Sequence, residues 1–240
     1  MRADTPIYLQ VADDLARDIA HAEAGTALPS ETELARERGV HRQTARAALE
    51  ELERRYLVRR EQGRRSLVAR RLDYRIGPDT PPSWTETIRR AGATPTLRTE
   101  SLGPRKPPSW VRERLAVGND AMLLLLKRLR YVDGELAGCS DSWIVDELVR
   151  GLHQRLGDGG SLHLTFANYG LTPVRSWTRA EFVFATPGIA RRLAVSGRPM
   201  VLQLNGQTDS ARHRRPIELT TSWLRSDFFR VIYETTGDER

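Results

Sequence analysis

The stretch LPSETELARERGVHRQTARAAL, residues 28–49, decides how the N-terminal part of this chain folds. Ser30 followed three residues later by Glu33 is the pattern of a capping box, in which each side chain accepts a hydrogen bond from the backbone N–H of the other residue. The pattern predicts a helix that begins after Ser30 and ends near Gly39. A second helix is expected from about Arg42 to Arg55, because apolar residues recur at helical spacing. They are Ala45, Ala48, Leu49 and Leu52.

A further helix and a hairpin flank these two helices. Apolar residues spaced by four predict an amphipathic helix from about Pro6 to Ala24, which Gly25 stops. They are Ile7, Val11, Leu15 and Ile19. Residues 57–68 have the pattern of two short strands around Gly63, which is a β-hairpin with a basic tip. Three helices followed by such a hairpin predict a winged helix-turn-helix.

Positive charge is concentrated in this same part of the chain. The 240 residues carry a net charge of +7, and residues 38–71 hold eleven arginines and four acidic residues, an excess that equals the whole net charge. Arg42, Gln43 and Arg46 are predicted near the start of the last helix, and an arginine fork matches guanine O6 and N7 in the major groove. A solvated basic surface is the alternative. The coincidence of charge with a helix-and-hairpin pattern favours double-stranded DNA as the partner.

Several short motifs, in order and at fixed spacing, resemble a known family. They are Leu-Pro-Ser-Glu at 28–31, Glu-Leu-Ala at 33–35, Val-x-Arg-x-Thr-x-Arg-x-Ala-Leu at 40–49, Leu-Glu at 52–53 and Arg-Arg-x-x-Gly-Arg at 59–64. The pattern covers roughly residues 5–70 and resembles the DNA-binding domain of GntR-family transcription regulators. By this resemblance Arg42 and Arg46 contact base edges, Gln43 contacts a base or a phosphate, and Thr44 holds a phosphate. Gly63 and Arg64 would form the tip of the wing near the minor groove.

The chain departs from the GntR pattern at three positions that belong to the expected DNA-binding set. Thr32 stands where the family usually has an arginine, His41 where it has a small hydroxyl residue, and Arg65 where the wing often has a second glycine. Thr32 implies one contact fewer from the second helix, and Arg65 places a bulky cation at the wing. His41 is expected to cap the helix or to contact a phosphate rather than to bind a metal.

The rest of the chain predicts a second domain of a different kind. Residues 71–82 contain three prolines and a glycine, so they are interpreted as a linker between a DNA-binding domain at 1–70 and a second domain at 83–240. The alternation of long strands and short helices predicts an α+β domain, a mostly antiparallel sheet with helices on one face. Strands are expected at 94–102, 121–131, 135–145, 174–185, 200–208, 215–225 and 230–234, and helices at 83–91, 108–116, 146–156, 162–169 and 187–195.

A second resemblance covers about residues 80–236. It is carried by Arg-x-Arg-x-x-Asp-Gly-Glu at 128–135, Tyr-Gly at 169–170, Arg175 with Glu181, Leu-x-Val at 193–195, and Arg-Pro-Ile-Glu at 215–218 followed by Arg-x-Asp-Phe at 225–228. This pattern is similar to the UTRA domain of the HutC subfamily of GntR regulators, an effector-binding domain with a chorismate lyase-like fold. Ala137 and Leu224 depart from it, at places where relatives often have proline and tyrosine.

An anion pocket is predicted in this domain. Arg128 and Arg130 lie two residues apart on a strand and therefore share a face, where two guanidinium groups repel unless an anion lies between them. Glu218 is expected to share a face with Thr220, Ser222 and Leu224, whereas Arg175 and Glu181 are both placed on the Trp177 side of their strand. By resemblance a hydroxyl from residues 83–87 helps to hold the anion. The set implied by the resemblance is Arg128, Arg130, Asp141, Arg175, Glu181 and Glu218; structural ion pairs within the sheet are the alternative.

These features predict a ligand-responsive transcription regulator, a repressor released by a small anionic metabolite such as a sugar phosphate, phosphonate or carboxylate. It is expected to act as a homodimer on a near-palindromic operator. Two other interpretations stay open, an enzyme that uses the chorismate lyase-like domain and a DNA-binding protein without sequence preference. No catalytic residues are assigned.

Composition also limits the location of the protein and the kinds of site that it can contain. No apolar run approaches the roughly 20 residues that cross a bilayer, and the N-terminus has no apolar signal core, so a cytoplasmic protein without a membrane partner is expected. Cys139 is the single cysteine, which forbids an internal disulfide and leaves no cysteine cluster for a metal. We expect neither a cofactor nor a metal.

Overall fold

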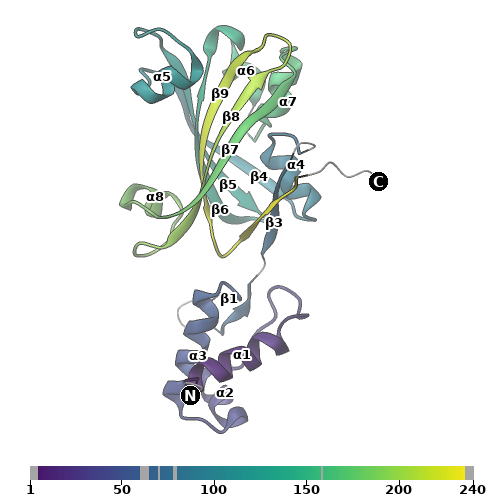
Figure 1. The fold of residues 1–240 in the computed structure, drawn as a ribbon, viewed down its shortest axis with the longest axis vertical. Coiled ribbons are helices and arrows are strands. Elements are labelled where there is room, and N and C mark those ends of the chain that lie inside the picture. The colour runs from purple at the N-terminus through teal and green to yellow at the C-terminus, as the bar shows by residue number, and fades with distance from the viewer. Residues whose placement is uncertain (1–4, 60–64, 70, 78–79, 158, 236–240) are drawn as a thin grey trace. The chain divides into compact units, whose positions relative to one another are not determined.

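The computed structural model describes residues 5–59, 65–69, 71–77, 80–157 and 159–235. The chain divides into two compact units, residues 1–71 (unit 1) and residues 72–240 (unit 2). Unit 1 contains α1 (Ile7–Asp18), α2 (Glu31–Arg38) and α3 (Arg42–Arg54), followed by β1 (Val58–Arg59) and β2 (Leu67–Val68) (Figure 1). The two strands pair antiparallel, with Val58 opposite Val68. The predicted tip of the hairpin, with Gly63 and Arg64, lies outside the described residues.

The three helices of unit 1 close over one apolar core. Apolar side chains of all three helices are buried there and meet those of both strands. From α3 the core receives the four residues predicted for its buried face, Ala45, Ala48, Leu49 and Leu52. The opposite face of α3 is thereby left to solvent.

The first helix is shorter than the predicted Pro6–Ala24, because it ends at Asp18. The backbone then tightens, with the N–H of Ala20 bonded to the carbonyl of Arg17 at 3.2 Å, a three-residue spacing that ends an α-helix. The chain turns and runs beside β2, where the N–H groups of Gly25 and Leu28 donate to the carbonyls of Val68 and Ser66. The hairpin thus gains a third neighbour from residues 25–28, which lie just after the predicted end of the helix.

The capping box at the start of α2 is formed as predicted. Ser30 Oγ accepts from the N–H of Glu33 at 3.3 Å, and Glu33 Oε2 accepts from the N–H of Ser30 at 2.8 Å. These hydrogen bonds, helped by Arg65, hold the pKa of Glu33 below its ordinary value. At the other end Gly39 takes a left-handed conformation with φ of 63°, which ends the helix.

Substitution of Ser30 by alanine is expected to lower the stability of unit 1 by about 1 kcal/mol, within the 0.5–2 kcal/mol typical of lost N-caps. The cause is the loss of the acceptor for the Glu33 N–H. Thermal unfolding followed by circular dichroism checks this, with Thr32→Ala as the matched control, because Thr32 is exposed in the same turn. Equal melting temperatures for the two variants would contradict a stabilising cap.

Unit 2 is built on a six-stranded antiparallel sheet in the order β4-β5-β6-β9-β8-β7. The strands are β4 (Pro95–Arg105), β5 (Leu123–Val132), β6 (Glu135–Ile144), β7 (Pro173–Phe184), β8 (Met200–Ser210) and β9 (Arg215–Arg225). The helices are α4 (Trp84–Arg90), α5 (Ser109–Leu115), α6 (Leu152–Leu156), α7 (Leu162–Asn168) and α8 (Pro187–Arg192), with a 3₁₀ turn, η1, at Asp146–Leu148. The α+β class predicted from the sequence is confirmed.

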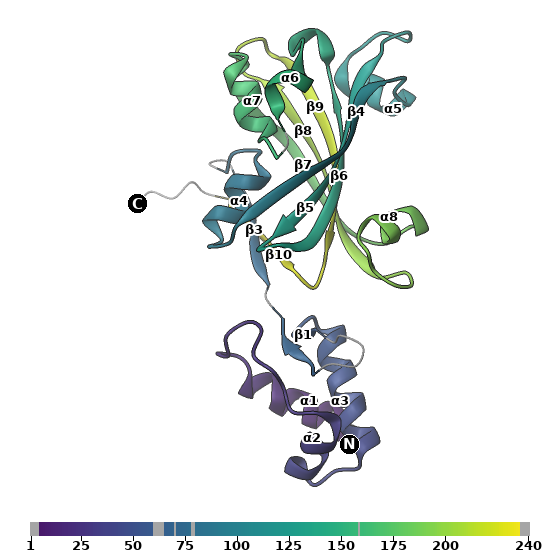
Figure 2. The ribbon, with the colours of Figure 1, turned by 180° about the vertical axis from the view of Figure 1, so that it is seen from behind.

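Helices cover both faces of the sheet, not one as predicted. Figures 1 and 2 show α4 and α7 on one face and α5 and α8 on the other. Leu126 faces α6 and α7, whereas Leu129 of the same strand packs against α8. Both faces of the central strands are therefore apolar in places, which a simple alternation of apolar and polar residues does not reveal. The helix predicted at 146–156 is also divided, because Gly151 between η1 and α6 has a φ of 75°.

The predicted linker at 71–82 contains a strand instead of an irregular segment. β3 (Leu72–Ile76) pairs in parallel with β10 (Phe229–Tyr233). Tyr74 and Ile76 are 8% and 5% exposed and pack with Phe229 and Trp84 in one core cluster. The partner strand lies 157 residues later in the chain, and such a distant pairing leaves no local signal in a segment next to prolines.

No helix in the described ranges is long and apolar enough to span a membrane.

Candidate functional site

Two places in the described structure gather residues of the predicted sets, and the first is the exposed face of α3. His41 caps this helix, with Nδ1 accepting from the N–H of Gln43 at 3.2 Å. Arg42 and Arg46 follow one turn apart, with side chains 69% and 59% exposed, and Gln43 is exposed beside them. Thr44 is half-buried. The first turns of α3 thus present the side chains that the sequence predicts for base contacts.

Acidic neighbours hold these two arginines in the free protein. Arg42 lies 3.3 Å from Glu31 of α2, and Arg46 donates to Glu50 of its own helix at 2.8 Å. Exposed ion pairs of this kind contribute only about 0–1 kcal/mol, so a phosphate or a base edge can replace the carboxylates at little cost. Arg65 is exposed and bonds Glu33 at 2.8 Å, beside the start of α2 where Thr32 is also exposed.

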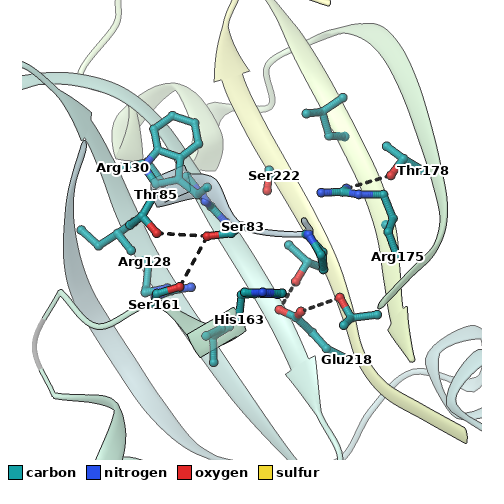
Figure 3. A pocket seen from close by; sticks show the side chains of 18 of the residues that line it. Ser83, Thr85, Arg128, Arg130, Ser161, His163, Arg175, Thr178, Glu218 and Ser222 are labelled. Carbon is teal, nitrogen blue, oxygen red and sulfur yellow. Dashed lines mark hydrogen bonds between the residues drawn. The ribbon is translucent and has the colours of Figure 1, made fainter. Parts of the chain in front are cut away.

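The second place is a cavity in unit 2 with a volume of about 70 Å³. This is several times the roughly 10–15 Å³ that one water molecule requires, so the cavity has room for a small ion. Its lining comes from β3, β4, β5, β7, β8 and β9 and from the starts of α4 and α7. Figure 3 shows the side chains of Arg128, Arg130, Arg175 and Glu218 around it.

Arg128 and Arg130 project from β5 into this cavity and are only 4% and 5% exposed. Arg128 Nη1 donates to the carbonyl of Gly160 at 2.8 Å, and the guanidinium of Arg130 lies 5.0 Å from the centre of the Trp84 ring. Burial and then the charge of Arg130 lower the pKa of Arg128 to about 9, and burial lowers the pKa of Arg130. Two buried cations side by side disfavour each other's charge, so a negative group placed between them is electrostatically favourable.

Arg175 reaches the same cavity from β7. Its Nη1 donates to Thr178 Oγ1 at 2.9 Å, as Figure 3 shows. A β-bulge between Arg175 and Trp177 makes this possible, because the extra residue turns Arg175 to the face opposite that of Trp177. The sequence placed both on one side of the strand, and this was wrong.

Glu218 is the acidic member of the cavity and is 7% exposed. Its two carboxylate oxygens accept from the hydroxyls of Thr208, at 3.1 Å, and of Thr220. Free lone pairs remain on both oxygens, so Glu218 can also accept from an N–H or O–H of a bound molecule.

Serine and threonine hydroxyls complete the lining. Ser83 Oγ lies 3.0 Å from Thr85 Oγ1 and 3.5 Å from Ser161 Oγ, so the three oxygens are near neighbours (Figure 3). Ser83 and Ser161 are also the N-caps of α4 and α7. Helix capping therefore positions these hydroxyls, and each can turn its hydrogen toward an anion.

Several buried nitrogens of this cavity have no hydrogen-bond partner among the described residues. They are Nε of Arg128, Arg130 and Arg175, Nε1 of Trp84 and Nδ1 of His163. A buried donor without a partner costs about 1–3 kcal/mol, more when it is charged. Three guanidinium groups face one carboxylate here, so the cavity carries an excess of positive charge together with these unpaired donors.

A wider cleft of about 530 Å³ continues from the cavity. Pro82, His163, Arg175 and Thr178 line both spaces. The cleft adds apolar surface from Val174, Trp177 and Tyr233. The two spaces together join a cluster of arginine side chains to a partly apolar cleft.

Two residues of the predicted pocket lie elsewhere. Asp141 is next to Ser140, which shares the Arg128 face, so alternation turns Asp141 to the other face of the sheet. There it accepts from Arg192 at 2.8 Å and lies 3.7 Å from Lys127. Glu181 is on the outer strand, paired with Arg179 at 3.2 Å and 44% exposed.

Sequence reasoning missed other lining residues, among them Ser161, His163 and Thr178. Ser161 precedes a predicted helix, and its capping role was a usable signal. Thr178 is brought in by the bulge, which the sequence does not mark. His163 is partly buried, and burial together with Arg175 lowers its pKa, so the neutral ring faces the cavity near neutral pH.

Comparisons with known proteins agree with this architecture. Residues 90–230 match the family model described as "UTRA domain", and residues 7–68 match "Bacterial regulatory proteins, gntR family". A similar curated protein is the HTH-type transcriptional regulator GgaR of Escherichia coli K12, 27% identical over 233 residues, which cover 96% of this chain and 92% of GgaR. The probable transcriptional regulator PhnF of the same strain is 26% identical, over 95% of this chain and 94% of PhnF.

Solved structures show the same fold. The crystal structure of PhnF from Mycobacterium smegmatis aligns with a TM-score of 0.64 and 23% identity, covering 96% of this chain and all of that one. The structure of the possible transcriptional regulator YydK from Bacillus subtilis aligns with a TM-score of 0.59 and 18% identity over 97% of this chain.

Proposed function

The chain belongs to the UTRA-domain regulators of the GntR family, with the HutC-like order of domains, and from this premise we propose that it is a repressor released from DNA by a small anionic metabolite. It is a transcription regulator with a helix-turn-helix and an effector domain. Unit 1 is the proposed DNA-binding part and unit 2 the proposed effector-binding and dimerisation part, meeting at residues 71 and 72. As a regulator of bacterial DNA it is proposed to act in the cytoplasm.

The unsatisfied arginine cluster carries the proposal of an anionic effector. The Nε atoms of Arg128, Arg130 and Arg175 are buried and lack partners among the described residues, although guanidinium groups are strong donors. A phosphate, phosphonate or carboxylate supplies acceptors to all three and offsets the repulsion between Arg128 and Arg130. Buried charges of one sign are rarely kept in a fold for stability alone, since they are costly unless paired.

Glu218 narrows the class of effector. A simple inorganic anion leaves this carboxylate facing negative charge. A molecule that carries an amine or hydroxyl near its acidic group binds the arginines through the acid and Glu218 through the amine or hydroxyl. The adjoining cleft of about 530 Å³ exceeds what an anion alone fills. The proposed effector is therefore a sugar phosphate, an amino phosphonate or a hydroxy or amino acid.

Unit 1 is proposed to place α3 in the major groove of operator DNA. Arg42 and Arg46 then contact base edges, Gln43 a base or a phosphate, and Thr44 a phosphate. His41, Thr32 and Arg65 border this surface and are proposed to contact the backbone. Two such heads in a homodimer read a near-palindromic site with half-sites about 34 Å apart. Gly63 and Arg64 are proposed to complete the wing.

Effector binding is proposed to act by shifting the population of dimer arrangements. A ligand changes DNA affinity only by the difference in its affinity for the DNA-competent and DNA-incompetent arrangements. We assign no catalytic step to the cavity, so the bound effector is expected to be recovered chemically unchanged after incubation with the protein.

A thermal-shift titration with inorganic phosphate tests the anion site. At constant ionic strength, set with chloride, phosphate is expected to raise the melting temperature of the full chain, because a ligand at 100 times its Kd stabilises by about 2.7 kcal/mol. Arg175→Met is the paired variant, expected to reduce the shift, and exposed Arg191→Met the control, expected to keep it. A shift that is the same in all three proteins would show that phosphate binds elsewhere.

A further inference from the structure

His163 lies at the junction of the cavity and the cleft of unit 2. Four described residues line both spaces, and they are Pro82, His163, Arg175 and Thr178. Among these four, only the imidazole of His163 ordinarily changes its charge near neutral pH. Figure 3 shows its ring extending from α7 toward Glu218. A molecule that occupies both spaces therefore passes a side chain whose charge depends on pH.

The position of His163 is set by the packing of α7. Leu162 and Phe166 of the same helix are 6% and 0% exposed and belong to the core cluster that includes Leu126 of β5. Ser161 caps the start of the helix. The imidazole thus enters the site from an anchored helix, and a ligand finds it already in place.

In the ligand-free protein the ring of His163 is neutral near neutral pH. Burial and then the charge of Arg175 lower its pKa, and they outweigh the opposing charges of Glu218 and Glu86. Glu86 is also paired with Arg90 at 2.9 Å. The charged groups around the ring come from α4, β5, β7 and β9, and they are Glu86, Arg128, Arg130, Arg175 and Glu218. The cations outnumber the carboxylates, so the empty cavity disfavours a proton on the ring.

One ring nitrogen of His163 lacks a hydrogen-bond partner. Its Nδ1 is buried, and no group among the described residues bonds to it. A neutral imidazole carries a hydrogen on one nitrogen only, whereas the protonated ring donates from both. An anion offers acceptors alone, so it bonds to Nδ1 only when this nitrogen carries a hydrogen. Protonation provides that hydrogen whichever nitrogen carries it in the neutral ring.

The charge of the cavity couples this proton to a bound anion. With His163 neutral, the three guanidinium groups of Arg128, Arg130 and Arg175 and the carboxylate of Glu218 give 3 − 1 = +2. A doubly charged anion cancels this excess, and an opposite charge within about 4–6 Å favours the protonated form of a histidine. Anion binding and protonation of the ring therefore favour each other.

We propose that His163 takes up a proton from solvent when a doubly charged anion binds in the cavity, and then donates a hydrogen bond to that anion. The proposal rests on the effector site proposed above and adds the residue that makes this site sensitive to pH and to the charge of the ligand. A singly charged anion cancels only part of the excess charge and draws the proton less. His163 thus favours effectors whose acid group is a dianion.

The sign of the pH dependence follows from the linkage. The pKa of His163 is higher in the complex than in the free protein, so the affinity for the anion rises as the pH falls through the pKa of the complex. One linked proton changes the affinity by at most about tenfold per pH unit. The pKa of Arg128 is about 9, so this residue stays charged below pH 8 and adds little to the effect.

Isothermal titration calorimetry of the full chain with sulfate tests the proposal. Sulfate is tetrahedral and keeps both charges near neutral pH, so any proton taken up on binding goes to the protein. Titrations at pH 6 and pH 7.5, each in two phosphate-free buffers with different ionisation enthalpies, give the Kd and the number of protons taken up. We expect the wild type to bind sulfate several-fold more tightly at pH 6 and to take up protons from the buffer.

Two variants and a second anion make the test specific. His163→Gln keeps a hydrogen-bonding side chain that does not titrate, and we expect its sulfate affinity to be the same at both pH values, without proton uptake. His153→Gln is the matched control, because His153 is exposed on α6, and it keeps the wild-type behaviour. Methanesulfonate carries one charge on a similar group, and its affinity for the wild type is expected to change less with pH. Thermal melts without anion confirm that each variant folds at both pH values.

The outcomes separate this proposal from the effector site itself. Equal sulfate affinities of the wild type at pH 6 and pH 7.5 would overturn the role of His163 and leave the anion site standing. Proton uptake that persists in His163→Gln would do the same, because it assigns the proton to another group such as Glu218. Sulfate that does not bind at either pH also overturns the proposal, and the phosphate titration then decides whether the anion site exists.

Discussion

Substitution of Arg46 by alanine is expected to weaken operator binding by about 1–3 kcal/mol, roughly 5- to 150-fold, and to relax the preference at one base pair. Arg46 is exposed on α3, one turn after the helix start, and bonds only the exposed Glu50 among the contacts described for it. That surface ion pair is weak, so its loss on DNA binding subtracts little from the contact with a base. In the wild-type protein almost all of the binding free energy of a bidentate contact between Arg46 and guanine is therefore available, and Arg46→Ala loses it.

The measurement is a fluorescence anisotropy titration on an operator obtained by in vitro selection, at one fixed salt concentration. The control is Arg17→Ala, another exposed arginine of unit 1, which pairs with Asp14 of its own helix α1. The loss of one positive charge weakens the nonspecific attraction to DNA phosphates. This effect is the same in both variants and for every DNA sequence. Unchanged operator affinity in Arg46→Ala would contradict the assignment of α3 as the recognition helix.

Substitution of Arg128 by methionine is expected to abolish the response to effector without lowering the stability of the ligand-free protein. Because burial lowers the pKa of Arg128 to about 9, its charge opposes folding at neutral pH. Relief of that charge offsets the lost hydrogen bond to the Gly160 carbonyl, which is worth about 1 kcal/mol. If Arg128 destabilises the ligand-free protein and is required for the effector response, its role is to bind the effector.

The stability of the ligand-free protein is also expected to depend on pH, in a direction set by the pKa of Arg128. The pKa of Arg128 in the folded chain lies well below its ordinary value, so the unfolded chain holds more protons than the folded chain above about pH 9. Stability of the ligand-free wild type therefore rises as the pH increases through about 9, and this rise is smaller in Arg128→Met. Chemical denaturation at pH 8 and pH 10 measures it. The control is Lys127→Met, whose side chain leaves β5 on the other face and pairs with Asp141.

Local patterns were sufficient to predict unit 1. The Ser30 and Glu33 side chains act within one turn, and the buried face of α3 follows from helical periodicity alone. The end of α1 was predicted wrongly, because the backbone of Gly25 and Leu28 bonds to β2, some forty residues later. A contact that distant has no trace in the periodicity of the helix itself.

In unit 2 the sequence located the arginines correctly where strands were regular. Arg128 and Arg130 share a face because they lie two apart on β5, and Glu218 and Thr220 do so on β9. A single bulge then reversed the assignment for β7, bringing Arg175 in while Glu181 stayed outside. Alternation along β6 also places Asp141 outside the cavity, because its neighbour Ser140 lies opposite Arg128.

In the proposed regulator, an anion bound in the cavity of unit 2 changes the affinity of unit 1 for DNA. The direct test is the operator Kd of the full chain with and without a compound that raises its melting temperature, chosen from sugar phosphates, phosphonates and carboxylates. We expect such a compound to raise the Kd at least about tenfold, or 1.4 kcal/mol, in the wild type and not in Arg128→Met. An operator Kd that stays constant while the compound occupies the cavity would contradict it.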